Sequence, residues 1–534
     1  MKVPRYLILP MEGIRLSDAA SPARKLLAML RPKNQAAVAT LGKKLMASVT
    51  EATATVEGRG AAVKRAGDAN APVAKPAIEV VGSLGEDGVK LVVASPEILA
   101  ALRQNNPGIR IIEEKFCRPA LAPRAVVPPR PTVPAGAHVA GGVPVPTPVV
   151  VEVIRGDTMT PLRGADVIAF RTDQDALKKK TNAAGKVTLS FGTAVTKLKR
   201  LYVYHEEPGV WGFFKSKVTV TAGAVKVVLA RLDLSVTDSL RHFHQSGKLT
   251  DGVGVRVGII DSGADQDHPD LVDAIEGGAN CVPESTRTED DFGPDGAHGT
   301  HVAGTIAGRG KAPEGVRGIA PGAKLRIYRV FESGNPSSGS SFAVIDAIER
   351  AIRDQCDIIN LSLGFDPGVT DDAISDALAK ARNNGILAVA AAGNDRRQPV
   401  GFPGSDANCV AVSAAGRKGL FPTTATEVDE VAAPIGSDPQ TFIAAFSNVG
   451  ADLDATGSGV GVVSTFPGGY GPMSGTSMAS PAVAGVAARL LAAKPSILRM
   501  PRDAARSDAI RKLLMNACQS QQFGILFEGS GLPK

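Results

Sequence analysis

Three residues far apart in the chain, Asp261, His298 and Ser477, are of the types that cleave acyl bonds by nucleophilic catalysis. A serine hydroxyl is a weak nucleophile until a histidine removes its proton, and a buried carboxylate fixes the tautomer of that histidine. Asp261 directly follows the apolar run 255–260, and Ser477 begins an amphipathic segment that extends to residue 493. The order acid, histidine, serine predicts a triad with Ser477 as nucleophile, His298 as base and Asp261 as orienting carboxylate.

Asn394 is a candidate for stabilising the negative charge that such an attack creates. It follows the apolar run 386–390 in the string Ala-Ala-Gly-Asn. Its side-chain amide and the backbone N–H of Ser477, at a helix N-terminus, would bracket an oxyanion. Each of these residues taken alone would have an ordinary structural explanation as a turn former or helix cap. His301, one helical turn after His298, is expected to be structural.

Alternating strands and helices are expected from about residue 236 onwards. Apolar runs of buried-strand length occur at 255–260, 325–330, 357–361, 386–390 and 410–412. Between them, apolar residues recur at helical spacing. This alternation predicts an α/β domain over 236–534 with a doubly wound, mainly parallel sheet. Active sites in such sheets gather at the carboxyl ends of the strands, where Asp261 and Asn394 are expected.

Four strings occur in this order along the chain: Ile259-Ile260-Asp261-Ser262-Gly263, His298-Gly299-Thr300-His301-Val302-Ala303-Gly304, Ala391-Ala392-Gly393-Asn394 and Gly475-Thr476-Ser477-Met478-Ala479-Ser480-Pro481. Together they resemble the subtilisin-like serine proteases over roughly residues 250–495. The resemblance implies a serine endopeptidase acting on polypeptides, with Asp261, His298 and Ser477 as triad and Asn394 in the oxyanion hole.

The resemblance also implies substrate-binding residues. Residues Ser362, Leu363 and Gly364 resemble the family's edge segment, to which an extended substrate adds as a β-strand. A second group resembles one wall of the S1 pocket, and its members are Ala391, Ala392 and Gly393, with Gly401 near the floor. These small residues imply a roomy apolar pocket, whereas Asp395 at the rim would favour basic P1 groups.

The triad chemistry requires no cofactor, but one further segment bears on metals. The string His268-Pro269-Asp270-Leu271 resembles a family segment whose aspartate ligates a structural calcium. The loop 309–316, which would supply partner ligands, lacks asparagines and includes cations. A hard cation needs oxygen ligands, so a structural calcium ion stays open at this stage.

Residues 1–117 are expected to form a small α+β unit. The predicted order is a strand at 6–9, a helix within 35–66, a hairpin of 78–84 and 89–94, a helix after Ser95, and a strand at 109–113. This order is compatible with a ferredoxin-like fold. The stretch from Gly88 to Cys117 resembles the second half of the family's inhibitory propeptides, which implies a self-processed zymogen inhibited by its own N-terminal segment. An unrelated α/β module is the alternative.

Two segments separate this unit from the peptidase domain. Residues 118–148 contain nine prolines and are expected to form an extended linker. Residues 149–235 contain candidate strands separated by turn signals and predict a small antiparallel β-sandwich. This module weakly resembles carboxypeptidase-regulatory-like or transthyretin-like modules, which implies a spacer or an adhesion unit; an exposed Trp211 would favour the latter. Residues 417–441 look like an insertion that either extends the substrate groove or decorates the surface.

Composition limits the remaining functions. The 534 residues have a net charge of +7, and their short basic runs lack the interleaved aromatics of a nucleic-acid module. Five widely spaced cysteines without a Cys-x-x-Cys pair argue against a zinc ribbon or a dense disulfide framework. We find neither a clear signal peptide nor an apolar run of membrane-spanning length. We expect a monomer without a membrane span, either cytoplasmic or exported by a non-standard route.

Two other functions are alternatives to the endopeptidase. The first is an inactive protease fold that binds peptides through 362–364 and the β module. The second is an esterase or lipase of the α/β-hydrolase type. That type requires the chain order serine, acid, histidine, whereas Ser477 comes last here.

Overall fold

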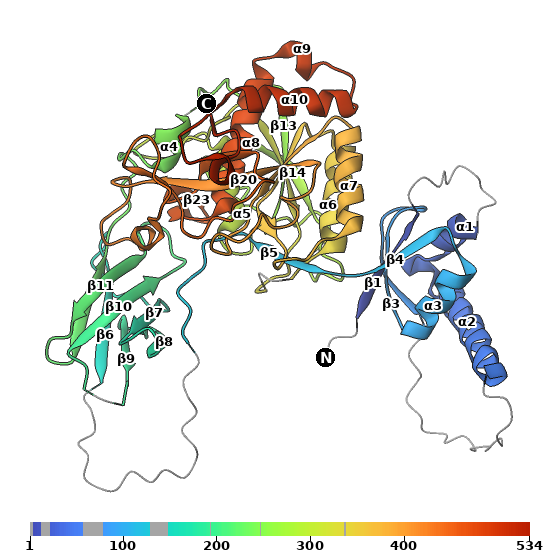
Figure 1. Cartoon of the computed structure of the whole chain (residues 1–534), viewed down its shortest axis with the longest axis horizontal. Helices are drawn as coiled ribbons and strands as arrows, with labels where there is room; N and C mark the ends of the chain where they lie inside the picture. The colour runs from blue at the N-terminus through green and yellow to red at the C-terminus, as the bar shows by residue number, and fades with distance from the viewer. Residues whose placement is uncertain are drawn as a thin grey trace, which may run out of the picture.

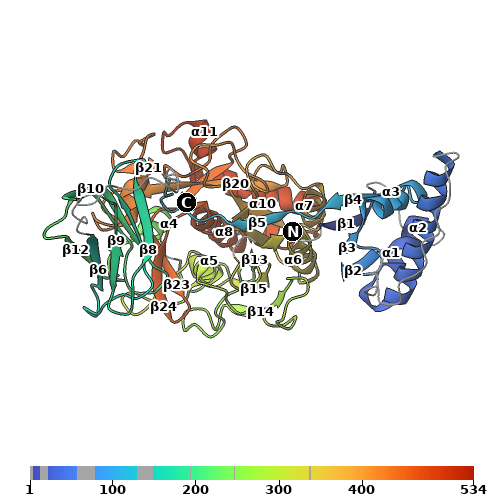
Figure 2. The same ribbon diagram turned by 90° about the horizontal axis from the view of Figure 1, so that it is seen from below.

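The computed structural model describes residues 4–11, 22–56, 78–128, 148–192, 194–245, 247–335 and 338–534. These residues form a small α+β unit, a β-rich unit and a large α/β domain. The α/β domain lies between the other two (Figures 1 and 2). Within the described ranges, no helix has the length and apolar character needed to cross a membrane.

The N-terminal unit is an antiparallel sheet with strand order β2-β3-β1-β4. Its strands are β1 (Arg5–Pro10), β2 (Ile78–Ser83), β3 (Lys90–Ala94) and β4 (Ile109–Glu113). Its helices are α1 (Pro22–Met29), η1 (Pro32–Asn34), α2 (Gln35–Val56) and α3 (Pro96–Asn105). Because successive side chains of a strand point to opposite faces, Ile8 packs under the helices while Leu7 and Leu9 face the α/β domain. Ser95 caps α3 as expected, accepting the Ile98 N–H.

The β-rich unit consists of two sheets, β11-β10-β7-β8 and β12-β6-β9. Its strands are β6 (Val149–Arg155), β7 (Asp166–Phe170), β8 (Ala176–Lys180), β9 (Lys186–Leu189), β10 (Lys197–Tyr204), β11 (Phe213–Thr219) and β12 (Ala224–Leu229). All pairs are antiparallel except β6 with β12, which is parallel. Strand β8 lies in a basic run whose lysines are exposed, and the apolar pattern there is too weak to indicate a strand. Trp211 is buried rather than exposed and packs against Ala425 and Val463 of the α/β domain.

The α/β domain is built on a sheet in the order β14-β15-β13-β17-β19-β20-β21, with β22 paired to β20. Its strands are β13 (Arg256–Asp261), β14 (Ile275–Asn280), β15 (Lys324–Arg329), β17 (Ile358–Leu361), β19 (Leu387–Ala391), β20 (Cys409–Arg417), β21 (Thr441–Ile443) and β22 (Ala455–Ser458). Only β21 is antiparallel to its neighbour. The predicted α/β class with a mainly parallel sheet is therefore confirmed.

Helices cover both faces of this sheet (Figure 1). One face packs α5 (His298–Ala307), α8 (Thr476–Ala492) and α10 (Ala504–Asn516), and the other packs α6 (Ser341–Arg353) and α7 (Asp372–Asn383). The two faces follow the alternation within β13, since Val257 and Ile259 contact the first layer and Ile260 the second. Smaller elements complete the domain: α4 (Ser239–His244), η2 (Thr426–Glu430), β23 (Val462–Phe466), β24 (Gly469–Met473), α9 (Pro495–Leu498), β25 (Cys518–Gln519), α11 (Ile525–Glu528) and β26 (Leu532–Pro533).

The expected linker at 118–148 begins inside a strand. Strand β5 (Phe116–Pro119) lies between β16 (Gly339–Ser340) and β18 (Leu363–Gly364) and is antiparallel to both. Prolines are tolerated here because Pro119 ends the strand, where the missing N–H removes no ladder bond. Residues 129–147 of the expected linker lie outside the described residues.

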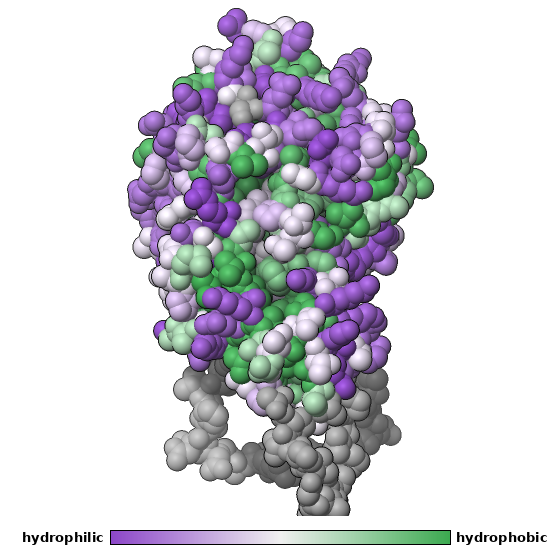
Figure 3. Space-filling view, turned by 90° about the vertical axis from the view of Figure 1, so that its left-hand side faces the viewer, coloured by the Kyte–Doolittle hydropathy of each residue, from purple (hydrophilic) through white to green (hydrophobic). Residues whose placement is uncertain are grey.

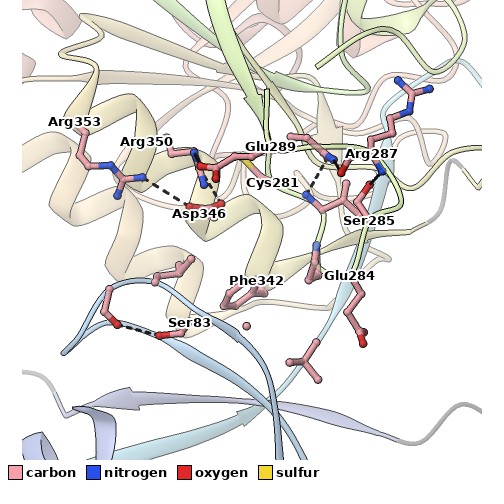
Figure 4. Close-up of a pocket in the computed structure, with 17 residues that line it drawn as sticks. Ser83, Cys281, Glu284, Ser285, Arg287, Glu289, Phe342, Asp346, Arg350 and Arg353 are labelled. Atoms are coloured by element: carbon pink, nitrogen blue, oxygen red, sulfur yellow. Dashed lines mark hydrogen bonds and ion pairs between the residues drawn. The ribbon is translucent and has the colours of Figure 1, made fainter. Parts of the chain in front are cut away.

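The N-terminal unit docks on α6 and α7 of the α/β domain. Leu7 and Leu91 join the apolar cluster that contains Phe342 of α6, and Arg110 forms an ion pair with Asp376 of α7. A cleft of about 580 Å³ remains between the β2–β3 hairpin and α6. Figure 4 shows Phe342 beside the hairpin that includes Ser83. Because the N-terminal unit is docked here, its last strand β4 ends close to the α/β domain, and the chain continues directly into β5, which pairs with that domain.

Candidate active site

Asp261 and His298 meet at the carboxyl end of β13. Both side chains are buried, and His298 Nδ1 lies 2.7 Å from Asp261 Oδ1. The same carboxylate oxygen accepts the Ser262 N–H at 2.7 Å. Because an ionised carboxylate only accepts hydrogen bonds, the Nδ1 proton belongs to the histidine, and its Nε2 lone pair is left available.

The start of α5 is held close to the turn after β13. Gly299 follows His298, and a Cβ at Gly299 would lie 2.0 Å from the carbonyl oxygen of Gly263. The Gly299 N–H donates to Ser262 Oγ at 3.2 Å. Only glycine permits this approach of the two backbones, which places the His298 ring over Asp261.

His301 has a different environment from His298. Its ring is fully buried, and Nε2 lies 2.9 Å from the carbonyl oxygen of Val462. Burial lowers the pKa of His301 to about 3, so the ring is neutral at physiological pH. These contacts fit the expected structural role of His301.

Ser477 lies in the first turn of α8. Gly475 precedes the helix with φ near +154°, and a Cβ there would lie 2.6 Å from the carbonyl oxygen of Ala120. Pro481 has no N–H to offer the carbonyl of Ser477 four residues earlier. The hydroxyl of Ser362 donates to that carbonyl instead, at 2.8 Å. This bond ties the start of α8 to the residue after β17.

The hydroxyl of Ser477 is not hydrogen-bonded to His298. Its Oγ donates to the carbonyl oxygen of Ser362 at 2.9 Å. The Nε2 atom of His298 is buried and has no hydrogen-bond partner among the described residues. The structure therefore joins the carboxylate and the histidine of the predicted triad, but not the histidine and the serine.

Asn394 lies beside the start of α8, as the oxyanion prediction requires. Its Oδ1 accepts the Thr476 N–H at 2.9 Å and the Thr476 hydroxyl at 3.0 Å. These two bonds fix the orientation of the amide. Its Nδ2 is buried and has no partner within the described ranges. An unpaired buried donor is costly, so Nδ2 is a candidate to bind an incoming oxygen.

The chain's own residues 116–120 occupy the groove at this site. The Ala120 N–H donates to the carbonyl oxygen of Ser362 at 3.1 Å, and the Ala120 carbonyl accepts the Ser477 N–H at 3.1 Å. Leu363 pairs with Pro119, and Gly364 pairs with Arg118. The predicted edge segment 362–364 is thus the segment to which β5 adds. The Ala120 carbonyl lies where a scissile carbonyl would lie.

Residues 391–393 lie beside the start of α8, directly before Asn394. Ala391 and Ala392 are buried, and the Gly393 N–H donates to the Thr476 hydroxyl at 3.2 Å. Asp395 Oδ1 lies 3.4 Å from Arg118 Nη2. If Ala120 is the P1 residue, Arg118 is the P3 residue. In this arrangement Asp395 therefore faces a P3 side chain, and the P1 preference stays a prediction.

Two participants were missed by sequence reasoning. Ala120 lies in a proline-rich stretch without an apolar pattern, so nothing there indicates a strand in a groove. Thr476 lies within the serine string, where its link to Asn394 depends on tertiary contacts alone. Cys117 is buried beside Gly339, and burial raises the pKa of its thiol, so it is not a nucleophile.

The Asp270 carboxylate is held against the loop 309–316. Its Oδ2 accepts the Val316 N–H at 2.8 Å, and Gly310 and Gly315 pack against the carboxylate. No group of three metal-ligating side chains occurs among the described residues. The Val316 N–H thus stabilises the charge of the carboxylate in this position.

Comparison with known proteins agrees with this architecture. The sequence model of the subtilase family matches residues 252–531. Subtilisin NAT of Bacillus subtilis subsp. natto is 41% identical over 250 residues, covering 46% of this chain and 57% of that protein. Subtilisin of Bacillus pumilus is 40% identical, and the match covers 46% of this chain and 79% of that protein. Subtilisin Savinase of Lederbergia lenta is 38% identical, and the match covers 46% of this chain and 79% of that protein. The chain thus spans little more than half the length of the first of these relatives. Because the family model matches more than half of this chain, the chain belongs to the subtilase family.

Proposed function

We propose that the protein is a serine endopeptidase that is made as a zymogen and cleaves itself between Ala120 and Leu121. The observation that supports this most is the Ala120 carbonyl, which accepts the N–H of Ser477 while β5 lies along the groove as an added strand. An amide held in this way has its carbonyl polarised beside a hydroxyl.

In the proposed reaction, Ser477 Oγ attacks the Ala120 carbonyl carbon and its proton passes to His298 Nε2. Asp261 holds the imidazolium, and the Ser477 N–H and Asn394 Nδ2 bind the oxyanion. The C–N bond to Leu121 then breaks as His298 returns the proton to the new amine. Water hydrolyses the acyl-enzyme by the same proton transfers in reverse.

The reaction requires a change of rotamer at Ser477. Its Oγ donates to the Ser362 carbonyl, while His298 Nε2 has no partner in the part of the chain that the structure describes. Rotation about the Cα–Cβ bond of Ser477 from one staggered position to another would break the bond to the Ser362 carbonyl and direct the hydroxyl towards His298 Nε2. This separation is also the observation that favours the second candidate, an inactive protease fold that only binds peptides.

Hydrolysis of a protein substrate distinguishes the two candidates. We expect the wild-type protein to degrade unfolded casein, and the Ser477→Ala chain to leave it intact. Degradation of casein by Ser477→Ala at the wild-type rate would contradict the proposal. If neither protein degrades casein, the result would favour the protein that only binds peptides.

We further propose that residues 1–117 are a ferredoxin-like inhibitory unit, and that 149–235 are a β-sandwich module retained after cleavage. The strand order β2-β3-β1-β4 and the continuous path from β4 into β5 support the first assignment. The contacts of Trp211 with the α/β domain support the second, because they join the module to the catalytic part of the chain.

Substitution of Gly82 should release the N-terminal unit. A Cβ at Gly82 would lie 2.6 Å from Phe342 Cζ, so Gly82→Leu must displace the ring on which the unit docks. Overpacking costs about 1–3 kcal/mol, which weakens docking by roughly 5–150-fold. We expect a shorter lag between appearance of the cleaved fragment and appearance of peptidase activity. The exposed substitution Lys43→Ala in α2 is the matched control, and an unchanged lag in Gly82→Leu would exclude inhibition by this docked face.

Removal of divalent cations should have no effect on stability. The Asp270 carboxylate is paired with the Val316 N–H, and we propose that no metal ion is required there or in the chemistry. We expect excess chelator to leave the midpoint of thermal unfolding unchanged. A bound structural ion at 100 times its Kd would contribute about 2.7 kcal/mol, so a chelator-induced fall of about 4 °C would contradict this proposal.

A further inference from the structure

The β-rich unit is fixed at the far end of the active-site groove. The Phe214 N–H donates to the carbonyl of Thr424 at 2.7 Å, and the Tyr202 hydroxyl donates to Asp429 Oδ2 at 2.8 Å. Both acceptors belong to the insertion at 417–441, and Glu427 in its helix η2 accepts the Ser474 hydroxyl at 3.0 Å. The β-rich module is therefore attached to the insertion through the two hydrogen bonds of Phe214 and Tyr202. From the module's side, apolar residues form patches within a largely hydrophilic surface (Figure 3).

The segment that follows the Ala120–Leu121 bond runs from the groove onto this module. The Ala122 N–H donates to the carbonyl of Ser474 at 2.9 Å, beside the catalytic serine. Three residues later, the Ala125 N–H donates to the hydroxyl of Tyr204 at 3.1 Å. The contacts of the residues after the scissile bond thus pass from the α/β domain to the β-rich unit.

Arg124 makes the most specific contacts in this segment. Its Nη1 lies 2.9 Å from Asp166 Oδ2, and its Nη2 lies 3.4 Å from Glu206 Oε1. Its guanidinium lies 5.4 Å from the centroid of the Tyr204 ring. Asp166 is almost fully buried, and its Oδ2 also lies 3.4 Å from Lys178 Nζ of the module, so Arg124 is the nearer of two cations on this carboxylate. A basic residue at the fourth position after the scissile bond satisfies all three groups.

Apolar contacts accompany this charge recognition. Ala125 and Val127 pack against a cluster on the module that includes Phe170 and Tyr202. Beside the segment, a cavity of about 570 Å³ extends between the module and the insertion. The surface defined by Asp166, Phe170, Tyr202, Tyr204 and Glu206 is called the module exosite below.

We propose that the module exosite binds the primed side of polypeptide substrates, favouring a basic residue four positions after the scissile bond and a small apolar residue next to it. This inference rests on the proposed endopeptidase. The segment 121–127 occupies the exosite before cleavage. After cleavage it becomes a free N-terminus that a longer substrate can displace. The β module then contributes to substrate selection rather than acting as a spacer.

Two peptides test this inference with the self-processed protein. One copies residues 116–128 with serine replacing the cysteine, and the other differs only by Glu at the position of Arg124. Charge pairing and cation–π contact at a partly desolvated site predict that the Arg peptide is cleaved with about tenfold higher kcat/KM. Tyr204→Ala removes only the cation–π contact and should lower this ratio by about two- to fivefold, whereas the exposed substitution Lys226→Ala on β12 should leave it unchanged.

A short chromogenic substrate that ends at P1 separates the possible failures. It should be cleaved equally by wild type, Tyr204→Ala and Lys226→Ala, which also shows that the variants fold. Equal kcat/KM for the two long peptides in wild type, with normal cleavage of the short substrate, would overturn the exosite and leave the endopeptidase standing. If the wild-type protein cleaves neither the two peptides nor the short substrate, the result would contradict the proposed endopeptidase activity. It would then also contradict a substrate-binding role for the module exosite.

Discussion

Wild-type protein should be recovered as two polypeptides cut between Ala120 and Leu121, whereas the Ser477→Ala chain should remain at full length. The Ala120 carbonyl already accepts the Ser477 N–H, and β5 is held by strands on both sides, so the reacting groups need no diffusional encounter. Loss of the nucleophilic serine in a triad enzyme lowers kcat by about 10⁶, which leaves no observable cleavage. Intact mass and N-terminal sequencing of both proteins measure the outcome.

The concentration dependence provides the control for this experiment. Cleavage within one chain is first order, so its half-time should not change on tenfold dilution. Cleavage in wild type at a different bond would contradict the register of β5 in the groove. Full-length wild-type protein, folded by circular dichroism and identical in mass to Ser477→Ala, would contradict self-processing.

Substitution of Asn394 should slow self-cleavage without blocking it. Asn394→Leu removes the buried Nδ2 donor, which has no partner among the described residues and in the proposed reaction binds the oxyanion that forms on Ala120. Loss of one oxyanion donor lowers kcat by about 10²–10³. The rate constant for appearance of the cleaved fragment, after refolding from denaturant, gives this ratio directly.

A second variant separates the donor from the structural contacts of the same amide. Asn394 Oδ1 also accepts the Thr476 N–H and hydroxyl, so Asn394→Leu breaks these bonds as well. Thr476→Val removes the hydroxyl that donates to Asn394 Oδ1 and accepts the Gly393 N–H, but it leaves the Nδ2 donor in place and should slow cleavage far less. Equal losses in the two variants would show that Asn394 acts by positioning α8 rather than by binding the oxyanion.

The strings that indicate the site could be located from sequence because each lies directly after an apolar strand or at a helix start. Asp261 ends β13, and Asn394 follows β19, two places away in the sheet order. Parallel strands bring such residues to the same edge, so the α/β pattern and the residue types together predict their proximity. The bond between His298 and Asp261 agrees with that prediction.

The occupied groove could not be predicted in the same way. Residues 118–128 are rich in proline, and composition alone favours an extended spacer. An added substrate strand is also extended and contributes few side-chain signals, so its position depends on partners at 339–340 and 363–364. The rotamer of Ser477 likewise depends on the Ser362 carbonyl, which is remote in sequence. The burial of Trp211 has the same cause, since its partners Ala425 and Val463 are distant in the chain.

Labelling by a fluorophosphonate tests most directly whether Ser477 is a nucleophile activated by His298. The processed wild-type protein should gain one adduct, which tandem mass spectrometry should assign to Ser477. The His298→Ala protein, produced as two polypeptides of residues 1–120 and 121–534, should gain almost none. An adduct on another residue, or equal labelling of Ser477 with and without His298, would contradict the proposed catalytic site.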